Sequence, residues 1–350
     1  MISAQCLSYR SLALAAIVLS TAPLLCRAAS WERFASLPAL GRDSPINMSF
    51  VDQRRGWLMD SSGSLWRTSD GGRTWQNLGK PERAAVIRFG FVSHSDGWLQ
   101  SHSHVLWTSD GGEHWRPLSL PRELLDGSIG DVCVQDKEHV WIVASTRAIS
   151  PPQRSRSESP GDHGVEGAIY STPDFGRTWM RGKVLATGFD TLSSIVFSSK
   201  NAGFALGHVG ILFSHDGGTT WHRGKLNTAC ISKGFMTRDT QFDDGAISVV
   251  SPGEAFVAYK HGEILRTTDG GENWCEVPQT RNTRWDFDAT QFTDTHSGWG
   301  RTWDHHLVHS TDGGVSWEPV HGVGDYVFDL RCTGGHAWLG TDQGIWELRR

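Results

Sequence analysis

Six aspartates recur in one short motif, and a carboxylate repeated in this way can act in catalysis, ligate a metal or accept hydrogen bonds. The motif reads [ST]-x-D-[GF]-G-x-x-W, and its copies contain Asp70, Asp110, Asp174, Asp216, Asp269 and Asp312. An aspartate before glycines is typical of a turn, in which the carboxylate accepts backbone N–H groups and the glycines adopt positive φ. The tryptophan that follows would begin a strand and bury its ring. We therefore expect these aspartates to be structural.

Histidines are the second set of side chains that could do chemistry, because neutral imidazoles bind zinc or copper. They are His102, His104, His208, His261, His305 and His306. They are spread over four repeats and lack the compact spacing of a metal site. We predict solvated turn residues, with no metal and no cofactor.

The elements that position these residues form a repeat. The motif returns about every 40 to 60 residues, which is typical of one supersecondary unit per copy. A second periodic signal is a small residue or Val, an aromatic residue and a short apolar strand. It occurs seven times, at Gly56-Trp57-Leu58, Gly97-Trp98-Leu99, Val140-Trp141-Ile142, Gly203-Phe204-Ala205, Ala255-Phe256-Val257, Gly298-Trp299-Gly300 and Ala337-Trp338-Leu339.

The motif resembles the Asp box, or bacterial neuraminidase repeat, of sialidases, sortilin-type receptors, xyloglucanases and photosystem II stability/assembly factors. This resemblance implies an all-β propeller, with each Asp box joining the third and fourth strands of a blade. Seven second strands against six boxes predict seven blades. Ser30-Trp31-Glu32-Arg33-Phe34 is similar to the segment from Thr74 to Leu78 after the first box. We therefore predict that the N-terminal strand completes the last blade and closes the ring, which protects its sheet edges.

The first 28 residues are typical of a secretory signal peptide, with Arg10 before an apolar stretch too short to span a membrane comfortably. We expect cleavage after Ala28, with Ala29 as an alternative, and no lipid anchor. We predict a propeller over residues 29–350, without a transmembrane segment, that is periplasmic or secreted (lumenal in a photosynthetic organism). Without the two arginines of residues 1–28, the chain has 31 basic and 38 acidic side chains, a net charge of −7. This balance argues against a nucleic-acid partner.

Four cysteines lie beyond the leader, and export would permit disulfides among them. Cys133 and Cys332 are expected on inner strands of blades that are not neighbours, which favours buried thiols. A bridge between Cys230 and Cys275 is one possibility that the sequence leaves open.

Two insertions, at residues 147–167 and 227–245, interrupt the repeat spacing. In a propeller, links between second and third strands, and links from one blade to the next, lie on the rim opposite the Asp boxes. Both insertions map to that rim, here called the top rim. Long loops on a rigid scaffold often carry function, although neutral drift is an equal alternative. The candidate partner-binding residues there are Arg147, Arg154, Arg156, His208, His261 and His305.

A sialidase-like or other glycan-acting enzyme is the alternative function. Sialidases need an arginine cluster, an acidic Asp and a Tyr nucleophile poised by Glu. Only Tyr170, Tyr259 and Tyr326 follow the leader, and the Phe-Arg-Ile-Pro motif of sialidases is absent. We predict no catalytic residue.

The photosystem II stability/assembly factor family is the closer resemblance, over about Trp31 to Arg350. Gly203 to Gly218 is similar to its unit G-[WF]-x-x-G-x-x-G-x-[IL]-x-x-[ST]-x-D-G-G. The resemblance implies a non-catalytic scaffold that holds a protein client, such as a membrane-protein assembly intermediate. The chain lacks the lipobox of cyanobacterial members, and its client need not be photosynthetic.

Overall fold

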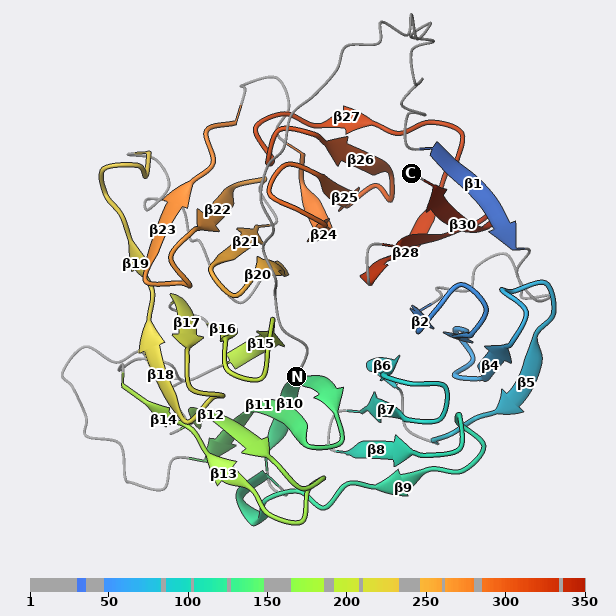
Figure 1. Ribbon diagram of the computed structural model, residues 1–350, viewed down its shortest axis with the longest axis horizontal. Helices are drawn as coiled ribbons and strands as arrows, with labels where there is room; N and C mark the ends of the chain where they lie inside the picture. Colours follow the sequence, from blue (N-terminus) through green and yellow to red (C-terminus); the bar gives the residue numbers. More distant parts are fainter. Residues whose placement is uncertain are drawn as a thin grey trace, which may run out of the picture.

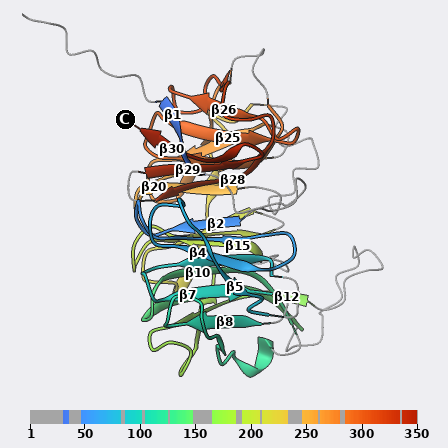
Figure 2. The ribbon, with the colours of Figure 1, turned by 90° about the vertical axis from the view of Figure 1, so that its right-hand side faces the viewer.

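Seven β-sheets arranged as a ring make up the protein (Figure 1). The computed structural model describes residues 30–35, 47–82, 86–101, 104–124, 127–147, 165–185, 192–207, 210–232, 246–259, 262–279, 285–333 and 336–349. Figure 2 shows the ring from the side, with most strands crossing its thickness. The predicted seven-bladed β-propeller is confirmed.

Each blade has four strands, here listed from the central channel outward. Blade one contains β2 (Asn47–Phe50), β3 (Gly56–Met59), β4 (Leu65–Thr68) and β5 (Gln76–Gly79). Blade two contains β6 (Arg88–Phe91), β7 (Gly97–Gln100), β8 (Val105–Thr108) and β9 (Arg116–Pro117). After the 3-10 helix η1 (Arg122–Leu124), blade three contains β10 (Ser128–Asp136), β11 (His139–Arg147), β12 (Val165–Thr172) and β13 (Met180–Arg181).

Blades four and five each gain a short fifth strand on the outside, parallel to the fourth. Blade four contains β15 (Leu192–Phe197), β16 (Gly203–Gly207), β17 (Gly210–Ser214), β18 (Thr220–Arg223) and the added β14 (Lys183–Val184). Blade five contains β20 (Ala246–Ser251), β21 (Glu254–Ala258), β22 (Ile264–Thr267), β23 (Asn273–Glu276) and the added β19 (Lys225–Leu226). Blade six contains β24 (Phe287–Phe292), β25 (Gly298–Thr302), β26 (Leu307–Ser310) and β27 (Glu318–Pro319).

The seventh blade joins the two ends of the chain, as predicted. It contains β28 (Val327–Thr333), β29 (His336–Thr341), β30 (Gly344–Arg349) and, outermost, β1 (Ser30–Ala35). Strand β1 is antiparallel to β30, with Trp31 opposite Leu348, and Figure 1 shows the two side by side in blue and dark red. The edge of the Trp31 ring meets Trp299 of blade six, with ring centroids 5.1 Å apart.

Aromatic rings at the blade interfaces explain the repeated small-aromatic pairs. At four interfaces the second-strand aromatic of one blade stacks on an inner-strand Phe of the next, as in Trp57 on Phe91 at 3.6 Å. The Asp-box Trp of that next blade, Trp115, meets the same Phe at 76°. A glycine precedes the aromatic in blades one, two, four and six, and at Gly56 it is required because a Cβ there would lie 2.3 Å from the Phe50 ring. The repeated pattern therefore describes contacts between blades as well as strands within them.

Candidate functional site

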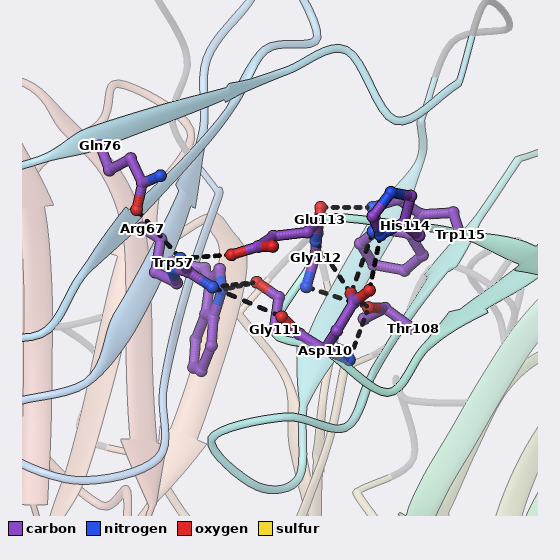
Figure 3. Close-up of polar contacts among 10 residues, drawn as sticks. All are labelled: Trp57, Arg67, Gln76, Thr108, Asp110, Gly111, Gly112, Glu113, His114 and Trp115. Atoms are coloured by element: carbon purple, nitrogen blue, oxygen red, sulfur yellow. Dashed lines mark hydrogen bonds and ion pairs between the residues drawn. The ribbon is translucent and has the colours of Figure 1, made fainter.

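The Asp boxes form a set of hydrogen-bonded turns on the bottom rim, the rim opposite the two insertions. In the box of blade two, the Thr108 hydroxyl donates to Asp110 Oδ1 at 2.8 Å and accepts the N–H of Gly112 at 3.0 Å (Figure 3). Asp110 Oδ1 also accepts the backbone N–H groups of Glu113 and His114, both at 3.0 Å. The described contacts thus occupy this carboxylate fully within its own turn.

Sequence reasoning missed one position of the motif, the residue directly before the Trp. Its side chain donates to the second oxygen of the aspartate in every box, as Thr74 does to Asp70 Oδ2 at 2.7 Å. The six donors are Thr74, His114, Thr178, Thr220, Asn273 and Ser316. The signal was present in the sequence, because all six are side chains that can donate a hydrogen bond.

These hydrogen bonds lower the pKa of the box carboxylates. The side-chain hydroxyl of Thr74 is the largest cause for Asp70, whose pKa falls to about 2. For Asp110, desolvation acts to raise the pKa, but hydrogen bonds from His114 outweigh it and bring the pKa to about 2. A carboxyl group that is ionised at neutral pH cannot act as a general acid there.

The boxes also tie neighbouring blades together. The indole N–H of Trp57 in blade one donates to the carbonyl of Gly111 in blade two at 2.9 Å, and Arg67 pairs with Glu113 across the same interface (Figure 3). Trp141 of blade three makes the equivalent bond to Gly217 of blade four at 2.8 Å.

Blade seven has no Asp box, and the acceptors that a box supplies are missing there. Trp299 and Trp31 occupy the corresponding interface between blades six and seven. Both indole nitrogens are buried without a hydrogen-bond partner among the described residues. The N-terminal strand therefore restores the packing of a box tryptophan without its hydrogen bonds.

Only one of the six candidate partner-binding residues has a described side chain. Arg154, Arg156, His208 and His261 lie outside the described residues, and Arg147 is described in its backbone alone, at the end of β11. His305 lies in the top-rim link between β25 and β26. Its ring stacks on Tyr326 at 3.9 Å, and its Nε2 and the Tyr326 hydroxyl are 2.8 Å apart.

Parts of both predicted insertions are attached to the blades. Strands β11 and β12 pair as far as Arg147 opposite Val165, so the first link comprises residues 148–164. The second insertion starts in a segment attached to blade five, where Cys230 and Cys275 form a disulfide. Ser232 N–H donates to the Glu276 carboxylate at 2.7 Å in the same segment. The disulfide resolves the pairing that the sequence left open, while Cys133 is a free thiol whose pKa burial raises to about 12.

The three tyrosines are placed differently from a glycosidase nucleophile. Tyr170 and Tyr259 are buried. Burial, aided by Glu263, raises the pKa of Tyr259 well above its ordinary value, which disfavours the nucleophilic phenolate. Tyr326 is exposed, but the partner described for its hydroxyl is His305 rather than a glutamate. Among the described residues, no group of three or more His, Cys, Asp or Glu side chains could hold a metal ion.

Sequence comparisons find one group of proteins. The family described as "Photosynthesis system II assembly factor YCF48" matches residues 26–158, and the BNR/Asp-box repeat matches residues 212–223. The chain is 24% identical to the photosystem II assembly lipoprotein Ycf48 of Synechococcus sp. (strain CC9902), over 86% of this chain and 83% of the relative. It is 25% identical to the chloroplastic photosystem II stability/assembly factor HCF136 of Arabidopsis thaliana, over 77% and 76%.

Solved structures with the same fold include members of that group. YCF48 from Cyanidioschyzon merolae matches with a TM-score of 0.60 and 18% identity, over 91% of this chain and 98% of the other. The structure titled "YCF48 bound to D1 peptide" matches with a TM-score of 0.59 and 18% identity, over 91% and 96%. An ancestral GH74 enzyme has a TM-score of 0.60 at 13% identity, but only 46% of that chain is covered. Taken together, the family match over residues 26–158, the sequence relatives and the shared ring of seven blades support the predicted resemblance of the chain to the photosystem II assembly factor-like family of β-propellers.

Proposed function

We propose that the chain is an exported, non-catalytic scaffold whose top rim binds a protein client, an intermediate in the assembly of a membrane protein. The observation that carries this proposal is the match to sequence relatives that are named as assembly factors. A solved structure with the same fold, titled "YCF48 bound to D1 peptide", supports a protein client. Export rests on the predicted leader at residues 1–28. No helix among the described residues is long and apolar enough to cross a membrane.

The bottom rim holds the blades together and the insertions lie elsewhere, which supports the top rim as the binding surface. On the bottom rim, hydrogen bonds of the turns occupy the box carboxylates, and bonds such as Trp57 to Gly111 hold adjacent blades. The first insertion links β11 to β12, a connection between second and third strands, and the second lies between β19 and β20, on the way from blade four to blade five. A rigid ring presents such loops together to one partner.

The absence of catalysis is supported by the state of the acidic and phenolic groups. The box carboxylates have lowered pKa values, so they lack the proton that a general acid must donate. Tyr259 is buried with a raised pKa, and Tyr326 is hydrogen-bonded to an imidazole. These are not the surroundings of a tyrosine nucleophile poised by glutamate.

The test is capture of the client from a membrane extract by immobilised protein comprising residues 29–350. Replacing residues 148–164 with a short Gly-Ser link keeps Arg147 opposite Val165 and leaves the sheet of blade three intact. We expect this variant to fold and to retain less client, and Arg154→Glu/Arg156→Glu to weaken capture in a salt-dependent way. Arg73→Glu, at an exposed position of the first Asp box, is the control. Equal client yields from all variants would contradict binding through this rim.

A further inference from the structure

Two large aromatic side chains are exposed on neighbouring top-rim links of blades six and seven. Trp303 is 52% exposed and Tyr326 is 43% exposed, and they are two of only four strongly exposed large hydrophobic side chains among the described residues. Trp303 lies in the link between β25 and β26, and Tyr326 lies in the link that enters β28. His305 joins them, since it is two residues from Trp303 and its ring stacks on Tyr326. Exposed aromatic rings on neighbouring links are typical of an interaction site.

Backbone hydrogen bonds hold this aromatic pair on a rigid base. Trp303 N–H donates to the carbonyl of Asp286, in the link that enters blade six, at 3.0 Å. The carbonyl of His305 accepts the N–H of Val327, the first residue of β28, at 2.9 Å. The turn is thus anchored on both sides, and a partner that binds there pays little to order it.

His305 has a positive φ at a turn position that glycine fills in blades one and five. Its φ is 66°, and the only other non-glycine residue with positive φ in the described part of the chain is Phe175, which replaces a glycine in an Asp box. Nδ1 of His305 is buried without a hydrogen-bond partner among the described residues. Strain and an unpaired polar atom at one residue commonly accompany function. The stacking of His305 on Tyr326 and the contact between its Nε2 and the hydroxyl hold the Tyr326 ring beside the turn that carries Trp303.

Exposed carboxylates lie on the same links as the aromatic pair and on the links next to them. Four aspartates of the adjoining top-rim links are exposed, namely Asp286, Asp304, Asp325 and Asp342. Asp342 Oδ1 accepts the N–H groups of Asp325 and Tyr326, which keeps two of these acids next to the tyrosine. The guanidinium of Arg301, on β25, is a nearby cation, and it donates to the carbonyl of Phe328. Aromatic faces within a ring of carboxylates are complementary to a cationic side chain.

We propose that Trp303, His305 and Tyr326 form a docking platform for a basic segment of the protein client. A lysine or arginine of the segment lies over one exposed ring and faces the aspartates, and a neighbouring apolar side chain packs on the other ring. This inference rests on the proposed function and specifies the chemistry of the client at one place on the top rim.

The test uses peptides, because the client is unidentified. Random 12-residue peptides displayed on phage are selected on immobilised protein comprising residues 29–350, and the enriched peptides are synthesised and measured by fluorescence anisotropy. We expect the enriched peptides to carry at least two Lys or Arg residues beside an aromatic or aliphatic residue. We expect Trp303→Ala and Tyr326→Ala to weaken binding at least tenfold, and Asp304→Asn to reduce its salt dependence. Met180→Ala, on the outer strand of blade three and also 52% exposed, is the matched control and leaves binding unchanged.

Several outcomes would overturn the platform. A selection without basic enrichment would do so, and so would peptides that bind Trp303→Ala as tightly as the parent. Binding to an oligosaccharide array that disappears in Trp303→Ala would assign the rings to a sugar instead. Client capture that depends on residues 148–164 but not on Trp303 would remove the platform and leave the proposed function standing. Capture that is independent of both would remove the proposed function itself.

Discussion

Two equivalent tryptophans provide a matched test of how Asp boxes hold the ring together. Trp141 and Trp299 both lie on second strands and are 2% and 3% exposed. Trp141 donates its indole N–H to Gly217 of the next box, whereas Trp299 has no acceptor among the described residues because blade seven lacks a box. Replacing each with Phe removes a similar volume, which costs about 1–3 kcal/mol of unfolding free energy in either case.

The hydrogen bond should separate the two variants. Trp141→Phe also loses a net hydrogen-bond contribution of about 1 kcal/mol, while Trp299→Phe removes an unpaired buried donor whose desolvation costs about 1–3 kcal/mol. We therefore expect Trp141→Phe to be less stable than Trp299→Phe by about 2 kcal/mol or more. Urea unfolding followed by far-UV circular dichroism measures this difference, provided that both variants keep the parent m-value. Equal destabilisation, or a larger loss in Trp299→Phe, would refute the assigned role of the box carbonyl.

Four further predictions concern closure, an Asp-box carboxylate, acid stability and catalysis. Deleting Ser30–Ala35 exposes the edge of β30 and removes the burial of Trp31, which is worth about 2 kcal/mol. The deletion should therefore lower the melting temperature and promote association. A truncated monomer that melts like the parent would contradict ring closure. Asp216→Ala should cost about 1–2 kcal/mol, comparable to the loss of a helix cap, without selective loss of client binding. Because hydrogen bonds lower the pKa of Asp70 and Asp110 to about 2 in the folded state, the unfolded state binds more protons at low pH. Their stabilisation should be complete above about pH 4 and fade towards pH 2, so Asp110→Asn should show a shallower loss of stability over this range in acid titrations monitored by Trp fluorescence. The protein should show no sialidase or glucanase turnover above background, and turnover that disappears in Tyr326→Phe would argue for an enzyme.

The fold could be predicted from the sequence because its determinants are local and repeated. An aspartate before glycines defines a turn at each Asp box, and two periodic signals count the blades independently. The similarity of the sequence around Trp31 to the segment that follows the first Asp box predicted ring closure. An aromatic residue that fills a blade interface can be recognised in the sequence even where its hydrogen bonds are absent. The donor before each box tryptophan was overlooked because Thr, His, Asn and Ser share a function but not a residue type.

Contacts between distant parts of the chain could not be predicted in the same way. The disulfide joins Cys230 to Cys275 across 45 residues, and its existence depends on how the second insertion lies along β23. The sequence did not distinguish Trp303 from the buried aromatic residues of the repeat. Its exposure follows from its position in a link between two strands. In the inner strands, Asp131 pairs with Arg88 of blade two and accepts the N–H of Ile195 of blade four. That contact depends on the ring geometry, to which no motif points.

Site-specific photocrosslinking tests most directly whether the client binds the top rim. A photoreactive phenylalanine analogue is placed at position 156 in the first insertion or at position 303 on the top rim, and at position 73 or position 113 on the bottom rim. Each protein is then irradiated with membrane extract. We predict that one client is crosslinked from the top-rim positions and not from the bottom-rim positions. Crosslinking of that client from positions 73 and 113, with none from positions 156 and 303, would contradict the account.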